Sequence, residues 1–460
     1  MFFLRCWIVL FLSFHAHGQT LSPILIEGWS EADQTRALNK TFGNDPVIGR
    51  LTCPSMTRLH LKNKKSQSLI ASKVQAISKT HWKYTLRKGI FWWDETPVTI
   101  EDFQNFLTYQ ITEKNLIHQV EIKKTDDLNI DLHWKQPPVF GPFFTNGQPF
   151  YKTDTAHPLG FQCVGNYKPD GKNWKHLLPN TGYKVPRREL LFINTQKSSS
   201  PHLRFWTPSQ LKLEKEHLQN PPLCKHHVSL HGITLLRWNP KSSLLADKDL
   251  RSLLSHVLPR RTLARVGAAD LAQPSYSVIP PQHPGSPKDI KPKTLTEIAN
   301  ALDAMGYTKN HPDHSRKTPS GHQMSLSIKT PIHNILTQVL RDNLHAVGIE
   351  SRFDQEGFDL SVESLRLPWP DLDLEGLIPK PSSIFQQHLQ NYRMSLSRFE
   401  PDFKLLRPIH RFIEDEALLS TVIHHEACLD VRNDIHYGGQ LHTLNPDWFR
   451  DMIETINRGS

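Results

Sequence analysis

The segment RLPWPDLD, residues 366–373, brings one indole and two carboxylates together in a stretch with two prolines. A carboxylate held in a cleft that excludes water is a strong partner for an ammonium group, because burial strengthens a charge-assisted hydrogen bond. The indole is that of Trp369 and the carboxylates are those of Asp371 and Asp373, so the segment could bind a cation. The alternative is two acids on a solvated loop and a tryptophan packed in the interior, since most acidic side chains are exposed.

A second group of reactive side chains consists of Cys224, His226 and His227, with His231 nearby. Thiolate and imidazole are ligands of transition metals, so this spacing permits a metal site. However, Pro221-Pro222 places the group in a loop, and the 26 histidines of the chain are scattered along it. Without a closed ligand set we interpret these side chains as solvent-facing residues ahead of a strand, and we predict no metal site.

Enzyme motifs are absent from the sequence. It contains no G-x-S-x-G, no H-E-x-x-H, no phosphate-binding loop and no G-x-G-x-x-G. Cys163 and His157 could form a nucleophile and its base, but no third residue orients the pair. We therefore expect a protein that is not an enzyme and that carries no cofactor.

The stretch from His81 to Phe106 is the one around which the rest of the chain is organised. Residues 81–86 alternate between apolar and polar side chains, which is the pattern of a half-buried strand. A turn at Lys88-Gly89 should follow, and then a returning strand over residues 90–93.

A helix is expected directly after this hairpin. Thr99 stands three residues before Asp102, so the hydroxyl and the carboxylate can satisfy free amides at a helix N-terminus. The apolar stripe of the helix is Phe103, Phe106, Leu107 and Ile111.

These elements carry a resemblance to a known family. The run YTLRKGIFWWDETPVTIEDF, residues 84–103, resembles the signature Y-x-F-x-L-R-x-G-h-x-F-x-D-G-x-P-h-T-A-x-D-h, where h is hydrophobic. This is the signature of the family 5 extracellular solute-binding proteins, the dipeptide, oligopeptide and nickel binders of ABC importers. One position departs from it, because Glu95 replaces the glycine that follows the aspartate.

Further matches follow in the order of the family, from about residue 45 to about residue 425. They include a strand at 232–239, helices at 249–257, 294–307 and 335–349, and a strand at 358–362. The succession of strand and helix in this region predicts a lobe with a largely parallel sheet.

The resemblance implies an α/β fold of the class II periplasmic-binding-protein type, with two lobes, a ligand cleft between them and an extra subdomain on the first lobe. The expected division is residues 19–238 for lobe I, with the extra subdomain at about 45–150, then 239–420 for lobe II and 421–460 for the return to lobe I. The chain would cross between the lobes near residues 238–239 and again near residues 421–424.

The start of the chain predicts export. Arg5 precedes an apolar run over residues 6–14, and Ala16-His17-Gly18 is a small-x-small pattern suited to signal peptidase. The run is too short to remain as a membrane anchor. We therefore expect residues 1–18 to be a signal peptide, cleaved near Gly18, and the mature protein to be periplasmic.

Charge and cysteine content restrict the function further. The net charge of +10 comes from dispersed lysines and arginines, and no recognition helix or basic and aromatic stripe is present, so we predict no nucleic-acid binding. Four cysteines follow the signal peptide, and an oxidising compartment permits one or two disulfides. Their pairing stays open, and the four are Cys53, Cys163, Cys224 and Cys428.

The resemblance also implies the function. Peptide binders of this family commonly carry W-x-x-D after the strand that matches 358–362, and its carboxylate pairs with the ammonium of a peptide. Here the spacing is W-x-D-x-D. The resemblance therefore implies Asp371 as the first candidate for the ammonium contact, Asp373 as the second, and Trp369 as a residue that lines the cleft. We expect a monomeric substrate-binding protein that captures peptides or similar small solutes for an ABC transporter permease in the membrane. The alternatives are a binder of nickel, a metal chelate or haem on the same fold, or a degenerate relative that works as a sensor or partner-binding module without transport.

Overall fold

The structure is a computed structural model of the chain, and it describes residues 24–27, most of 48–433, and residues 435, 449, 452–453 and 456. Within 48–433 the residues outside the description are 61–64, 69, 114–115, 138–148, 158, 172, 183–187, 194–200, 202, 207–223, 225, 268–270, 288–289, 310–314, 331–334, 354–356, 367–373, 375–376, 379–381 and 397–401.

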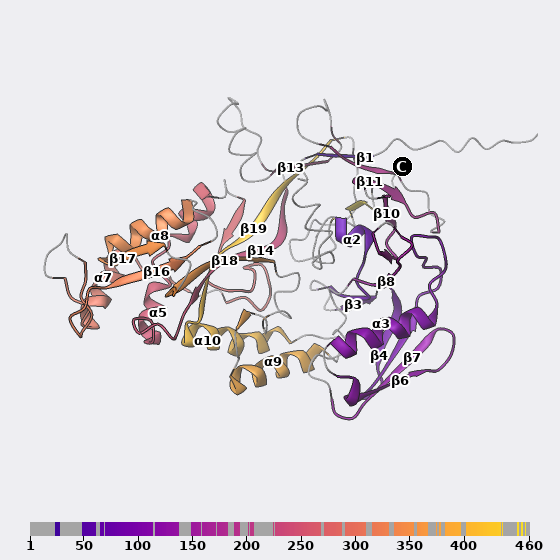
Figure 1. Ribbon diagram of the computed structural model, residues 1–460, viewed down its shortest axis with the longest axis horizontal. Helices are drawn as coiled ribbons and strands as arrows, with labels where there is room; N and C mark the ends of the chain where they lie inside the picture. The colour runs from indigo at the N-terminus through magenta and orange to yellow at the C-terminus, as the bar shows by residue number, and fades with distance from the viewer. Residues whose placement is uncertain are drawn as a thin grey trace, which may run out of the picture.

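Two long antiparallel strands, β14 (His226–Trp238) and β19 (Leu419–Val431), run through both halves of the molecule. In Figure 1 the earlier part of the chain, indigo to magenta, forms the right-hand half, and the later part, pink to orange, forms the left-hand half. We call them the first lobe, elements β1 to β13, and the second lobe, elements α5 to α10. The fold is therefore α/β with two lobes, as the sequence predicts.

One sheet extends through both lobes. Its described strands lie in the order β10-β11-β12-β1-β13-β19-β14-β18-β16-β17, and β15 pairs with β19. Their bounds are β1 (Ile24–Glu27), β10 (Tyr167–Asp170), β11 (Asn173–Pro179), β12 (Leu190–Ile193), β13 (Leu203–Trp206), β15 (Ala272–Pro274), β16 (Ser325–Lys329), β17 (Glu350–Phe353) and β18 (Leu360–Arg366). β16 pairs in parallel with both β17 and β18, which confirms the parallel pairing predicted for this lobe.

The extra subdomain of the first lobe is a four-stranded antiparallel sheet, in the order β4-β5-β7-β6, with one face covered by helix α3. Its elements are β4 (Ala71–Ala76), β5 (His81–Leu86), α3 (Ile100–Glu113), β6 (Val120–Lys124) and β7 (Asn129–Trp134). Shorter elements of this lobe are α2 (Ile48–Thr52), β2 (Thr57–His60), β3 (Lys65–Ser68), η2 (Ile117–Gln119), β8 (Tyr151–Thr153) and β9 (Phe161–Cys163).

The predicted strand and helix of this subdomain are confirmed. Every second residue of β5 is buried against α3, as the alternation of residues 81–86 requires. Thr99 and Asp102 form the expected cap, since the Thr99 amide donates to Asp102 Oδ2 at 2.9 Å and the Asp102 amide donates to Thr99 Oγ1 at 3.2 Å. The Trp92 indole also donates to Asp102 Oδ2, at 3.1 Å, so the cap holds the preceding loop as well.

The prediction of a returning strand at residues 90–93 is wrong. The amides here do not form the ladder of a sheet: Trp92 donates to the Thr96 carbonyl within a compact loop, and Trp93 donates to the Cys163 carbonyl. The two indoles point into different cores: Trp92 packs in the subdomain core, and Trp93 packs against the main sheet of the first lobe. Residues 90–93 are therefore apolar because they lie where two cores meet, and not because they form a strand.

Glu95, which stands where the family signature has glycine, adopts a left-handed backbone with φ of +70°. The signature turn is therefore kept without the residue type that favours it. The side chain lies at the surface, 3.4 Å from Lys168 Nζ. An exposed ion pair of this kind contributes little to stability. It therefore offsets little of the steric cost of placing the Glu95 β-carbon in a left-handed backbone.

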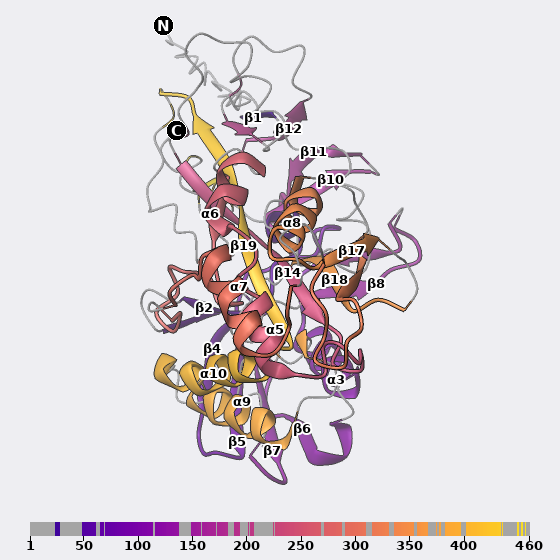
Figure 2. The same ribbon diagram turned by 90° about the vertical axis from the view of Figure 1, so that its left-hand side faces the viewer.

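The second lobe has two cores on either side of its sheet strands. One is formed with helices α5 (Lys248–Leu254), α7 (Leu295–Ala304) and α8 (Ile335–Ala346), and the other with α9 (Ser383–Leu396) and α10 (Leu406–Glu416), which lie side by side (Figures 1 and 2). Shorter elements are α6 (Arg260–Thr262), η4 (Leu263–Gly267) and η6 (Phe403–Leu405). Among the described residues, no helix combines the length and the apolar content that crossing a bilayer requires.

The pairing of β14 with β19 changes register where the strands pass between the lobes. Val228 packs in the core of the first lobe, and Leu236 packs in that of the second. Between them, Ser229 pairs with Glu426 while Gly232 pairs with His425, so β14 carries two extra residues against one step of β19. A bulge of this kind bends a strand and increases its local twist.

His424 on β19 is buried, with 6% of the residue exposed, and its Nε2 donates to the Ser277 carbonyl at 2.9 Å. Burial is the main cause that lowers the pKa of this imidazole to about 4. An unfolded histidine has a pKa of about 6.5, so the unfolded chain binds the extra proton between these two values. His424 therefore contributes stability that is present above about pH 6.5 and is lost as the pH falls toward 4.

We predict that Glu95→Gly stabilises the protein by about 0.5–1 kcal/mol, because glycine adopts a positive φ without a steric cost. Chemical denaturation of both proteins measures the difference. Glu101→Gly is the matched control: Glu101 also pairs with a lysine, Lys124, but it lies in the first turn of α3 and should lose about 0.5–1 kcal/mol. A loss of stability in Glu95→Gly equal to that of the control would contradict the strain at this turn.

We predict that His424→Gln flattens the dependence of stability on pH. Glutamine keeps an N–H donor for the Ser277 carbonyl but cannot take up a proton. The free energy of unfolding, measured by denaturant titration between about pH 7 and pH 4.5, should therefore fall less steeply than in the unmodified protein. His322→Gln, at an exposed position, is the control and should keep the original slope. Equal slopes in all three proteins would show that His424 does not carry the effect.

Candidate functional site

The three residues predicted to contact a ligand, Trp369, Asp371 and Asp373, lie outside the described residues. The structure does place the strand that leads into them. β18 ends at Arg366, which pairs with Gly232, and Gly232 lies beside the bulge where β14 passes between the lobes. The segment that carries the three candidates therefore begins at the end of β18 nearest the junction of the lobes.

Polar side chains occupy this junction on the crossing strands. Thr234 Oγ1 lies 2.8 Å from His425 Nε2 and 3.0 Å from Ser364 Oγ, which links β14, β19 and β18. Gly232 leaves room for this arrangement, because a β-carbon there would lie 3.2 Å from the His425 ring. These contacts hold three strands in register at the point where a movement between the lobes would concentrate.

Glu426 adds a buried carboxylate to the same junction, with 5% of the residue exposed. Gln273 Nε2 donates to its Oε1 at 2.6 Å, and His227 Nδ1 lies 3.1 Å from its Oε2. A carboxylate removed from water needs such partners, because its burial is otherwise costly. Since Gln273 lies on β15 and His227 on β14, Glu426 links two of the strands that pair with β19.

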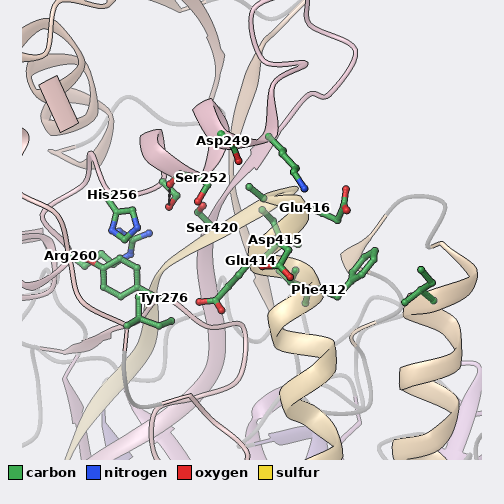
Figure 3. Close-up of a pocket in the computed structure, with 17 residues that line it drawn as sticks. Asp249, Ser252, His256, Arg260, Tyr276, Phe412, Glu414, Asp415, Glu416 and Ser420 are labelled. Atoms are coloured by element: carbon green, nitrogen blue, oxygen red, sulfur yellow. Dashed lines mark hydrogen bonds between the residues drawn. The ribbon is translucent and has the colours of Figure 1, made fainter. Parts of the chain in front are cut away.

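A pocket of about 540 Å³ lies in the second lobe (Figure 3). His256, Arg260 and Tyr276 form one wall, and the carboxylates at the end of α10 form the opposite one. The Arg260 guanidinium lies 3.7 Å from the centre of the Tyr276 ring, and its Nε donates to the Thr421 carbonyl at 2.8 Å. These contacts fix the cation in place as part of the wall.

The surroundings of Arg260 and His256 determine the protonation states of these two side chains. Burial lowers the pKa of Arg260 to about 10, so the guanidinium stays protonated at neutral pH. Burial, followed by the charge of Arg260, lowers the pKa of His256 to about 4, so its imidazole is neutral there. The pocket thus offers a fixed cation, a neutral imidazole and an aromatic face to a polar solute.

The acidic wall depends on how α10 ends. Ala417 takes a left-handed conformation with φ of +45°. The buried Arg251 then donates to the carbonyls of Glu416 and Ala417, at 2.6 and 3.2 Å, which satisfies orphan acceptors at this helix end. Glu414 and Asp415 remain beside the pocket (Figure 3). All the lining residues belong to 248–420, so this pocket lies within the second lobe.

The cysteines form two disulfides, Cys53–Cys163 and Cys224–Cys428. Cys163 is therefore not a free nucleophile for His157, whose pKa is lowered by burial. Cys224 is likewise not available as a thiolate ligand for the metal site considered beside His226 and His227. Instead, its disulfide ties the chain just before β14 to the neighbouring strand β19.

Sequence reasoning did not single out His256, Arg260 or Tyr276. These residues show no local spacing that signals a shared site, and Glu414 is more than 130 positions away from all three. The pocket forms because the β19 backbone, the end of α10 and the chain around Arg260 converge. Only the packing of the second lobe brings them together.

Comparisons with known proteins bear on the fold and the family. No family model matches the chain. The oligopeptide-binding protein OppA of Bacillus subtilis (strain 168) is 23% identical over 344 residues, which cover 59% of this chain and 61% of that protein. The matched part of the chain thus spans about three fifths of the length of this curated relative.

Solved structures with similar folds cover nearly the whole chain. The periplasmic oligopeptide-binding protein of an ABC transporter from Thermotoga maritima has a TM-score of 0.69 at 12% identity and covers 96% of this chain and 99% of that chain. AppA from Bacillus subtilis, in complex with a nonapeptide, has 0.66 at 12% and covers 94% and 98%. NikA from Staphylococcus aureus, in complex with Ni(L-His)2, has 0.64 at 14% and covers 92% and 98%.

These neighbours show the fold, and OppA adds a match at the level of sequence. The chain therefore has the two-lobed α/β fold of the periplasmic-binding-protein type, and its resemblance to the family 5 extracellular solute-binding proteins is confirmed.

Proposed function

We propose that this protein is the substrate-binding component of an ABC importer, and that it captures peptides or similar small solutes for a permease in the membrane. The observation that carries the proposal is the pair of strands β14 and β19, which contribute to the cores of both lobes and change register between them. Similarity to OppA and to AppA with its nonapeptide favours a peptide over other solutes.

The mechanism follows from the two-lobed architecture. A ligand shifts an equilibrium between open and closed forms only if it binds the closed form more tightly. Contacts to both lobes at once provide this difference, because they are complete only when the lobes approach each other. The bulge of β14 at Ser229–Gly232 is where we place the bending that brings the lobes together.

We place the ligand contacts at Trp369, Asp371 and Asp373. Their segment follows Arg366, whose pairing with Gly232 sets the start of the segment beside the junction. Asp371 would accept hydrogen bonds from the peptide ammonium, with Asp373 as the second choice, and Trp369 would cover the first side chains of the peptide. The polar contacts of Thr234 with His425 and Ser364 hold the strands from which this segment starts.

The division of the chain into residues 19–238, 239–420 and 421–460 belongs to the same proposal, as do export by the signal peptide at residues 1–18 and action as a monomer. The disulfides Cys53–Cys163 and Cys224–Cys428 support an oxidising compartment outside the cytoplasm.

We predict that peptides with a free N-terminus raise the melting temperature of the purified protein, because a ligand that binds only the folded state stabilises it by mass action. A pool of synthetic tri- to pentapeptides of mixed sequence serves as the probe, next to the same pool with acetylated N-termini. The free pool should produce the shift and the acetylated pool should not. For the best single peptide, calorimetry should show Asp371→Asn binding roughly ten- to a hundredfold more weakly, as expected for a lost hydrogen bond between charged groups.

Asp342→Asn changes an exposed acid of α8 outside the ligand segment; it is the control and should bind within about twofold of the unmodified protein. Equal shifts from the free and the acetylated pools would exclude the ammonium contact while leaving peptide binding in place. If neither pool shifts the melting temperature but Ni(L-His)2 does, the ligand is a nickel chelate and the peptide proposal is wrong. No shift with any of these probes would reject a peptide as the ligand.

A further inference from the structure

Three side chains that commonly ligate metals meet on the open face of the subdomain sheet. His81 on β5 pairs directly across the sheet with His133 on β7, and Asp131 lies two residues before His133. Side chains two positions apart on a strand share a face, so all three point to the side opposite α3. The neighbouring positions, Trp82 and Leu132, point into the core instead.

The spacing of the three groups fits one small ion. One ligand atom from each residue lies within 4.8 Å of the other two. His81 Nε2 and Asp131 Oδ2 are 3.4 Å apart, and the two imidazole rings stack with their centres 4.1 Å apart. In a tetrahedral zinc site with bonds of about 2.0–2.1 Å, adjacent ligand atoms lie about 3.4 Å from each other. The contact between His81 and Asp131 therefore has the length of one edge of such a site.

Hydrogen bonding within the described part of the chain leaves this cluster incomplete. His81 Nε2 and Asp131 Oδ1 are buried atoms with no hydrogen-bond partner there. Buried polar atoms nearly always have one, so each exception calls for an explanation. A cation bound between the two side chains would supply it.

The lysines that flank Asp131 do not supply the explanation. Lys83 on β5 and Lys123 on β6 are its direct neighbours across the sheet. Among the described ion pairs, however, Asp131 pairs with His81 and with neither lysine. The side chains of His81 and Asp131 are 28% and 14% exposed, which shields the group from bulk water but leaves it open for an ion to enter.

We propose that His81, Asp131 and His133 form a binding site for a divalent transition metal, and that Zn²⁺ is the ion their chemistry suits best. Two imidazoles and one carboxylate are a common three-residue zinc ligand set, with a fourth position left to water. Mg²⁺ and Ca²⁺ prefer oxygen ligands and would gain little from the two nitrogens. The ion would join β5 to β7, the two middle strands of the subdomain sheet.

The site is separate from the proposed ligand contacts. It lies on the extra subdomain of the first lobe, whereas Arg366, from which the ligand segment starts, pairs with Gly232 at the junction of the lobes. Zinc binding and peptide binding can therefore be present or absent independently of each other.

The test uses the full chain, stripped of metal with EDTA and then freed of the chelator. Calorimetric titration with ZnCl₂ should show one ion per chain, and ZnCl₂ should raise the melting temperature where MgCl₂ at the same concentration does not. His81→Gln and His133→Gln should each weaken Zn²⁺ binding at least about tenfold. A loss of this size is common even when only a residue that supports a metal ligand is changed. Asp131→Asn keeps the shape of the side chain, loses its charge and should have the same effect.

His118→Gln is the matched control, because His118 is an exposed histidine of the same subdomain outside the cluster, and it should bind Zn²⁺ as the unmodified protein does. Melting temperatures in EDTA show which variants fold; if one histidine variant does not, the other and Asp131→Asn decide. Equal Zn²⁺ affinity in the unmodified protein and in the folded cluster variants would place the zinc elsewhere and overturn the proposal. A chain that binds no Zn²⁺ would overturn it as well.

Discussion

The antiparallel pairing of β14 with β19 is the interaction on which the rest of the structure depends. Each strand has 13 residues, and each contributes side chains to the core of both lobes. The lobes therefore share one ladder of backbone hydrogen bonds, and neither can separate from the other without breaking it. The ladder is interrupted at the bulge beside Gly232, where two residues of β14 have no matching step in β19, and again between Thr234 and Leu235.

The pairing of β14 with β19 gives a role to the buried polar side chains of β19. His424 and Glu426 are both buried, and each has its partner: the Ser277 carbonyl for the imidazole, and Gln273 and His227 for the carboxylate. Satisfied polar groups in a core add little net stability but penalise any slipped pairing, in which they would lose their partners. The polar residues of β19 thus help to specify its register against β14 and β15 at the junction of the lobes.

The same junction relates the fold to solute binding. β18 ends at Arg366 beside the bulge, so the segment proposed to contact the ligand starts at the junction of the lobes. The pocket between Arg260 and the end of α10 has a different origin, because all of its walls belong to the second lobe and do not depend on how the lobes approach. The cluster at His81 is more distant again, on the open face of the subdomain sheet. The pocket and the metal cluster therefore lie on elements other than β18, from which the proposed ligand segment starts.

What the sequence determined by itself was local. Alternation placed β5 and its buried face, and the spacing of Thr99 and Asp102 placed the start of α3, because these signals depend only on residues within a turn or two. The resemblance carried by residues 84–103 extended this to the whole two-lobed fold. Even the turn at Glu95 was kept after its glycine was lost, since the surrounding structure holds the backbone in place.

Tertiary structure alone decided the rest. Trp92 and Trp93 pack in separate cores, and His81 pairs with His133 across the sheet. The disulfides join cysteines that are 110 and 204 residues apart in the chain. The physical reason is common to all of them: strand register and core packing select partners that are distant in the chain, and they do so through the free energy of the whole fold, which local spacing does not contain.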